Sequence, residues 1–116
     1  MSELIFHACR REEWEAARSS TAAVYAGSSQ DAADGFIHFS TAEQVIESVN
    51  KHRAGQSGLV LLAADPAVLG ERLKWEPSRR GLLFPHVYGG LPVSAVRWAR
   101  DLPLEADGRH SFPPLD

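Results

Sequence analysis

The sequence predicts a single α+β domain, and three observations favour this fold class. Apolar strand formers at Phe36–Phe39 are followed by a helical apolar stripe over Ala42–Val49, which is typical of a strand that leads into a helix. A continuous apolar run, Leu59–Ala64, is typical of a strand buried on both faces. The length of 116 residues is near the commonest domain size, and no repeat or linker divides the chain.

The N-terminal part is predicted to form a strand, a helix and then a loop. The apolar run Leu4–Cys9, which contains His7, predicts the strand. Charged residues surround Trp14 in Arg10–Ser19, so this segment is expected to be an amphipathic helix with Trp14 in the core. Ser20–Asp34 is rich in Ser, Ala, Gly and Asp and is predicted to be a loop.

The central strand-to-helix unit contains the first candidate catalytic residue. Ser40 and Glu43 are three residues apart and fit a capping box, so the helix is expected to begin after Ser40 and to end near His52-Arg53. His38 lies two residues before this cap, beside the free N–H groups of a helix start, where anions bind readily.

After the buried run Leu59–Ala64, the chain is predicted to hold two more strands. Asp65-Pro66 ends the buried run and favours a helical turn over Pro66–Leu73, with Asp65 as its cap and Pro66 in its first position. A short strand is expected at Lys74–Glu76, and Ser94–Leu102 alternates like a strand with one exposed side. The domain is therefore expected to span residues 1–103, with the proline-rich segment 104–116 as a loose tail.

The composition argues against several functional classes. The formal net charge is −3 and no cluster of basic residues occurs, so no broad nucleic-acid surface is expected. Arg79-Arg80 either holds one phosphate or is a solvated loop pair. Cys9 is the only cysteine and is expected to be a small buried residue. Because no apolar run approaches the roughly 20 residues of a membrane helix and the acidic start is unlike a signal peptide, we expect a cytoplasmic protein.

Three of the five histidines are candidates for chemistry. His7, His38 and His86 lie in apolar or glycine-flanked contexts, whereas His52 and His110 are expected to be solvated. Histidine titrates near neutral pH and can act as an acid, a base or a donor to phosphate. If these strands and the helix start meet, the three imidazoles share one cleft.

Aromatic side chains accompany the third of these histidines. Pro85–Gly90 alternates imidazole and aromatic groups, so His86 and Tyr88 point to the same face if the segment is extended. Tyr25 is the one large side chain of the predicted loop and either packs that loop down or walls the cleft.

Other interpretations of the histidines remain open at this point. Each can be a hydrogen-bonded core residue without a ligand. A three-histidine zinc site of a metal-dependent hydrolase is a further alternative, although no two of the three have short metal-ligand spacing. The sequence contains no G-x-S-x-G, G-x-G-x-x-G or P-loop motif.

From Leu4 to about Leu102, the sequence resembles a bacterial family catalogued as domain of unknown function number 952. Several motifs in the same order carry the resemblance. They are Ile5-Phe6-His7 with Trp14, Gly35–Thr41 with Gln44, Leu61-Leu62 with Asp65, Trp75-Glu76, and Phe84–Leu91. Family members commonly have proline at the position of Gly90.

The resemblance implies an ADP-ribosyltransferase-like fold, with a split mixed β core, a few short helices and an NAD cleft between the sheets. On that basis His7 is expected to bind a ribose hydroxyl, and His38 takes the place of a tyrosine that stacks on nicotinamide. The transferase glutamate has no clear match, and Glu76 is a candidate by residue type only.

The leading hypothesis is therefore a cleft for a nucleotide-like ligand such as NAD or an ADP-ribose derivative, with ADP-ribosyl- or phosphotransferase-like chemistry. The expected catalytic residues are His38, His86 and Glu76. The expected ligand-binding residues are His7, Ser40, Thr41, Tyr88 and Tyr25. No cofactor is required, NAD would be a substrate, and no metal ligand is assigned. The alternatives are a non-catalytic small-molecule-binding module and the metal-dependent hydrolase.

Overall fold

Strand β4 (Leu59–Ala64) lies at the centre of the main sheet in the computed structural model, which describes residues 3–78 and 81–116. All six of its side chains are buried, as the continuous apolar run predicted. Strands β1 (Ile5–Arg10) and β8 (Val96–Leu102) pair with it antiparallel on either side. Since side chains alternate across a strand, β4 contributes to two cores, one on each face of the sheet.

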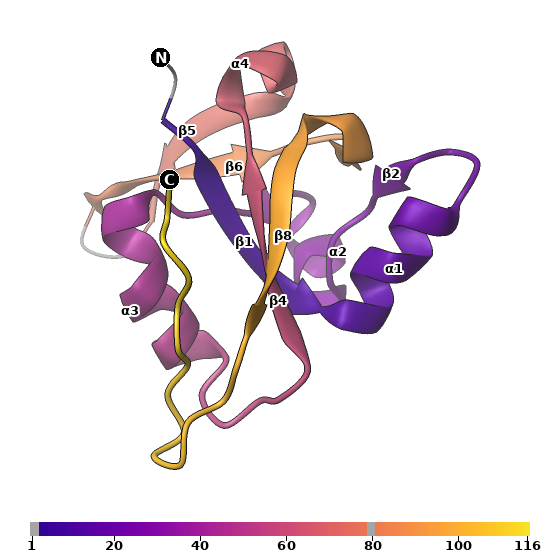
Figure 1. The fold of residues 1–116 in the computed structure, drawn as a ribbon. Coiled ribbons are helices and arrows are strands. Elements are labelled where there is room, and N and C mark those ends of the chain that lie inside the picture. Colours follow the sequence, from indigo (N-terminus) through magenta and orange to yellow (C-terminus); the bar gives the residue numbers. More distant parts are fainter. Residues whose placement is uncertain (1–2, 79–80) are drawn as a thin grey trace.

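Helices α1 (Arg11–Ser19) and α3 (Ala42–His52) cover opposite sides of this sheet (Figure 1). Trp14 anchors α1 in one core with 5% of its surface exposed, as predicted. Val45 and Val49 of α3 are buried in the other core, whereas Ile46, at the edge of the predicted stripe, is 46% exposed.

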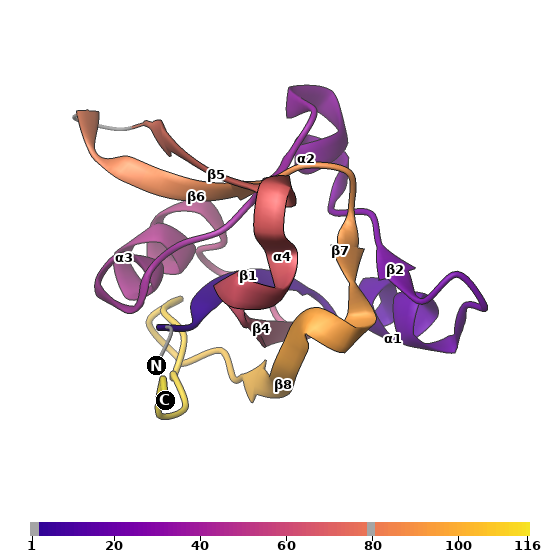
Figure 2. The ribbon, with the colours of Figure 1, turned by 90° about the horizontal axis from the view of Figure 1, so that it is seen from above.

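A second sheet has the strand order β3 (Ile37–His38), β6 (Leu83–Val87) and β5 (Leu73–Pro77). Figure 2 shows β5 and β6 side by side on one side of the molecule, with β8 on the opposite side. The main chains of Phe6 and Ser40 exchange two 2.8 Å hydrogen bonds, which join β1 to the segment after β3. This bridge brings β1 and β3 together, and with them His7 and His38.

The predicted loop between α1 and β3 contains regular structure that the sequence pattern did not reveal. Strand β2 (Val24–Tyr25) pairs with β7 (Leu91–Pro92), and helix α2 (Ser29–Asp34) follows it. The main-chain N–H of Ser28 donates to the Asp31 carboxylate at 2.7 Å, and the Asp31 N–H bonds to Ser28 Oγ. This capping box starts α2, and Gly35 ends it with a φ of 85°.

The remaining helical segments are single turns. They are α4 (Pro66–Leu69), η1 (Gly70–Arg72) and η3 (Val93–Ala95). Asp65 accepts a hydrogen bond from the Ala67 N–H at 3.0 Å, so the prediction of Asp65 as cap and Pro66 in the first position is confirmed.

The cap of α3 is one residue further along than predicted. Thr41, rather than Ser40, is the N-cap, and its N–H donates to Gln44 Oε1 at 3.0 Å. Ser40 is committed to the bridge with β1, so its main chain cannot serve as the helix start.

The C-terminal segment, expected to be a loose tail, runs along α3 and makes specific contacts there (Figure 1). The N–H of His110 donates to Asn50 Oδ1 at 3.0 Å, and its Nε2 lies 2.7 Å from the carbonyl oxygen of Gln56. Phe112 and Leu115 pack against the core cluster beside α3. His110 is only 6% exposed, so the expectation that it is solvated was wrong.

Two further expectations concern the surface of the molecule. The Arg79-Arg80 pair lies outside the described residues. Among residues 3–78 and 81–116, no helix is both long and apolar enough to cross a membrane.

Candidate functional site

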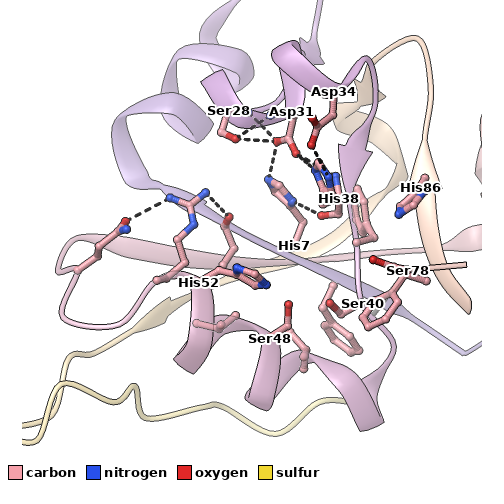
Figure 3. Close-up of a pocket in the computed structure, with 18 residues that line it drawn as sticks. His7, Ser28, Asp31, Asp34, His38, Ser40, Ser48, His52, Ser78 and His86 are labelled. Carbon is pink, nitrogen blue, oxygen red and sulfur yellow. Dashed lines mark hydrogen bonds and ion pairs between the residues drawn. The ribbon is translucent and has the colours of Figure 1, made fainter. Parts of the chain in front are cut away.

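A pocket of about 590 Å³ lies where β1, β3, β6 and α3 meet (Figure 3). Titratable and basic side chains line much of it: His7, Asp31, Asp34, His38, His52, Arg53 and His86. Four serines add hydroxyl groups: Ser28, Ser40, Ser48 and Ser78. The three histidines singled out from the sequence therefore do share one cavity.

His7 is held through both ring nitrogens. Its Nδ1 lies 2.6 Å from the main-chain oxygen of His38, which can only accept, so Nδ1 carries the proton. Nε2 then accepts from the Tyr25 hydroxyl at 2.9 Å. Burial lowers the pKa of His7, and the nearby Asp31 charge only partly opposes this effect. His7 is thus a neutral, fixed imidazole in the pocket wall.

Asp31 is the centre of a buried network beside His7. Its Oδ1 lies 2.5 Å from Nδ1 of His38 and accepts the His38 N–H at 3.0 Å, while Oδ2 accepts from the N–H and hydroxyl of Ser28. Burial raises the pKa of the Asp31 carboxyl, but the hydrogen bonds from His38 and Ser28 outweigh it, so the net pKa is lowered. Asp31 therefore stays ionised although it is 3% exposed.

His38 is clamped between two carboxylates of α2. In addition to its bond to Asp31, its Nε2 lies 3.0 Å from Oδ2 of Asp34, one turn further along the helix. The hydrogen bond to Asp31 raises the pKa of His38, and Asp34 adds to this against a smaller effect of burial. Both ring nitrogens of His38 face carboxylate oxygens, which can only accept, so this geometry favours the doubly protonated imidazolium. The side chain is 41% exposed at the pocket wall.

His86 belongs to a second network, across the β5–β6 hairpin. Its Nδ1 lies 2.7 Å from Oε1 of Glu76, which also accepts from the Tyr88 hydroxyl at 2.7 Å. The bond from Tyr88, followed by that from His86, lowers the pKa of Glu76. The ring of Phe36 stacks on His86 with centroids 4.1 Å apart. Because Glu76 holds Nδ1, Nε2 is the ring nitrogen of His86 that is left for a ligand in the pocket.

The other predicted site residues have different places. Ser40 lines the pocket, whereas Thr41 caps α3 and Tyr25 is buried behind His7 with 2% exposure. Of the two roles left open for Tyr25, packing applies. Glu76 and Tyr88 do not line the pocket and reach it only through His86.

Sequence reasoning missed Asp31, Asp34 and Arg53. Asp31 and Asp34 lie in the segment predicted to be a loop, and the signal that could have found them is the capping box that Ser28 forms with Asp31, followed by a glycine. Arg53 was taken as part of a helix end. In the described part of the chain, no group of three His, Cys, Asp or Glu side chains is arranged to hold a metal ion.

Comparison with known proteins places this chain in a family. Residues 8–99 match the model of a family described as protein of unknown function (DUF952), so the chain belongs to that family. The crystal structure of protein CC0527 from Caulobacter crescentus is similar over 93% of each chain, with 48% identity and a TM-score of 0.87. The solution NMR structure of CC0527 matches with 49% identity over 91% of this chain and 90% of that one, with a TM-score of 0.79. No functionally curated protein matches.

Proposed function

We propose that this protein is a small enzyme whose pocket takes a nucleotide-like ligand, such as NAD or an ADP-ribose derivative, and whose His86 transfers a proton. One observation carries the proposal: imidazoles from β1, β3 and β6, far apart in the sequence, line one cavity. Structural histidines have no reason to converge on open space, whereas a histidine at a ligand can act as an acid or a base near neutral pH.

The size and lining of the cavity support a small polar ligand. A volume of about 590 Å³ lies in the range of roughly 300–1,000 Å³ that is common for small-molecule sites. Phe6, Phe39 and Phe84 supply apolar wall area, and the serines and imidazoles supply donors and acceptors. The apolar walls suit a base or a nicotinamide ring, and the donors and acceptors suit a ribose with phosphates.

The chemistry is assigned to the pair of Glu76 and His86. Glu76 fixes His86 as the Nδ1–H tautomer and stabilises the imidazolium that forms when Nε2 takes a proton. That proton comes from a nucleophile as it attacks, while the bond to the leaving group breaks: the bond to nicotinamide in ADP-ribosyl transfer from NAD, or the bond from phosphorus to the leaving oxygen in phosphoryl transfer. Glu76 acts through His86, so in this proposal it is a positioning residue rather than the glutamate that contacts substrate in a transferase.

An ADP-ribosyltransferase-like fold is part of the same proposal. The separation of the β1–β4–β8 sheet from the β3–β6–β5 sheet supports it, because the pocket lies between β1 of one sheet and β6 of the other. His7 would then face the ribose. Its two hydrogen bonds already occupy both ring nitrogens, so a ribose bond requires Nε2 to exchange the Tyr25 hydroxyl for the ligand.

Calorimetric titration with NAD and with ADP-ribose, together with chromatography of the incubated ligands, tests the proposal. We expect saturable heat at millimolar ligand or below and a slow conversion that His86→Asn removes while binding persists. Glu43→Gln, an exposed change in the first turn of α3, is the matched control and should behave like the wild type. Absence of heat with either ligand at millimolar concentration would remove the proposal.

A non-catalytic binding module is the second candidate, and one observation favours it. Both ring nitrogens of His7 and both of His38 are already bonded inside the protein, so of the three imidazoles from β1, β3 and β6 His86 alone is left for proton transfer. If NAD or ADP-ribose binds and is recovered unchanged, with equal affinity in His86→Asn, the pocket is a receptor for its ligand and not an active site.

A further inference from the structure

Arg53 brings a guanidinium to the side of the pocket that is formed by the end of α3. One Nη donates to the carbonyl oxygen of Ala8 in β1 at 3.3 Å, and the other donates to Oε1 of Gln56 at 3.2 Å. A guanidinium has five N–H donors, so these two bonds orient the group and leave three donors. Within the described residues, Arg53 has no carboxylate partner.

The positive charge of Arg53 acts on His7 in the pocket wall. Arg53 lines the same pocket as His7, and after burial its charge contributes to lowering the pKa of His7. The two pocket carboxylates, Asp31 and Asp34, are paired with His38 instead. Positive charge at the α3 end is therefore not neutralised by an acidic side chain of the pocket.

Ser48 and His52 stand one helical turn apart on the face of α3 that lines the pocket. Figure 3 shows both side chains at the α3 side of the cavity, with His86 across from His52. A hydroxyl and an imidazole thus accompany the guanidinium. A helix C-terminus commonly attracts a basic residue through its dipole, but that effect does not explain a guanidinium that is hydrogen-bonded to β1 and lines a cavity.

We propose that Arg53, with Ser48 and His52, forms a subsite for the phosphoryl group of the ligand. The inference deepens the proposed function and rests on it. An arginine fork matches the geometry of phosphate oxygens, and two further donors suit a tetrahedral oxyanion better than a planar carboxylate. Since His86 lies on the opposite side of the cavity, the substrate class is a phosphorylated small molecule whose reacting group is remote from that phosphate.

NMR titration of the labelled protein with pyrophosphate, and separately with acetate, tests the subsite. We expect pyrophosphate to shift the amide signals of residues 48–53 in a saturable way, while acetate at equal concentration does not. Arg53→Met should weaken pyrophosphate binding at least tenfold. Arg18→Met removes a guanidinium from the end of α1, outside the pocket lining, and is the control for net charge.

A second pair of substitutions tests the phosphate subsite if the Arg53 variant does not fold. Should Arg53→Met fail to fold, Ser48→Ala with His52→Ala replaces it, because neither change touches the bonds to Ala8 and Gln56. Pyrophosphate binding that is unchanged in these variants, or acetate binding of equal strength, overturns the phosphate subsite. The proposed function is tested apart from this, since NAD conversion that depends on His86 can persist when the Arg53 variant binds pyrophosphate normally.

Discussion

The main-chain carbonyl of His38 accepts a hydrogen bond from Nδ1 of His7 at 2.6 Å, across 31 positions of sequence. This bond connects β1 of one sheet to β3 of the other at the wall of the pocket. It also fixes the tautomer of His7, so that Nε2 must accept a hydrogen bond from the Tyr25 hydroxyl. The shape of the site therefore depends on buried groups behind it as much as on the residues that face the cavity.

Tyr25→Phe tests this dependence on a buried hydroxyl. The ring stays, but Nε2 of His7 loses its donor inside the core, which should cost about 1–3 kcal/mol of unfolding free energy. Urea denaturation measures the loss. Tyr88→Phe removes a hydroxyl from the less buried Glu76 and is the control, and a loss as large as that of Tyr25→Phe would contradict the argument.

Asp31→Asn should be among the most destabilising polar substitutions in the chain. The change removes a buried charge that compensates the His38 imidazolium and receives bonds from Ser28, so we expect a loss of about 3 kcal/mol. Asp101→Asn is the matched control, because its ion pair with Arg11 is exposed and should contribute less than about 1 kcal/mol. Chemical denaturation at pH 7 compares the two, and equal losses would count against the network.

The stability of the protein should be greatest near pH 6.5, the ordinary pKa of histidine. The raised pKa of His38 gives a contribution that is complete below pH 6.5 and disappears as the pH rises through its folded pKa. The lowered pKa of His7 acts oppositely, since the unfolded chain takes up a proton first when the pH falls below 6.5. His38→Gln should therefore abolish the decline between pH 6.5 and 8.5, measured by urea denaturation. A variant that keeps this decline would show that another group causes it.

Local patterns in the sequence were sufficient for the elements that bury continuous or periodic apolar faces. Leu59–Ala64 is a strand because every side chain is apolar, and α3 follows from the spacing of Val45 and Val49. The mixed α+β class follows from such segments. The pairing of β1 with β4, and of β3 with β6, brings the three imidazoles together, and no local pattern contains that information.

The part of the site on α2 could not be predicted in the same way. Asp31 and Asp34 lie in a polar six-residue helix with no apolar stripe, so hydrophobic periodicity gives no signal there. Tyr25 was noted as the one large side chain of the region, but its partner, His7, is 18 positions away and is found only in the folded chain. Polar networks of this kind depend on tertiary contacts.

The C-terminal segment should stabilise the loop after α3, which contributes Gln56 to the pocket lining. His110 bonds to the carbonyl of Gln56, and the Gly55 N–H donates to Gly108 at 2.9 Å. His110→Ala should cost about 1–3 kcal/mol and speed hydrogen exchange at the Gly55 amide. Arg109→Ala changes an exposed neighbour and should alter stability by less than about 0.5 kcal/mol. If the Gly55 amide exchanges equally in both variants, the segment does not support the loop.

Gly27 should be required for the position of Asp31. Its φ is +95°, and an added Cβ would lie 2.8 Å from Cβ of Asp31 and 3.1 Å from Cγ1 of Ile37. Gly55 also has a positive φ, +75°, but an added Cβ there has open space around it. Gly55→Ala therefore measures the backbone cost alone, about 1–2 kcal/mol.

Gly27→Ala adds a steric clash to that backbone cost, so its loss of unfolding free energy should exceed the loss of Gly55→Ala. Because the clash pushes α2 away from β3, the bond between Asp31 and His38 should lengthen, and the pKa of His38 should fall toward its ordinary value. NMR titration of the His38 ring follows this change. A His38 pKa that stays raised in Gly27→Ala would mean that α2 absorbs the extra methyl group without moving Asp31.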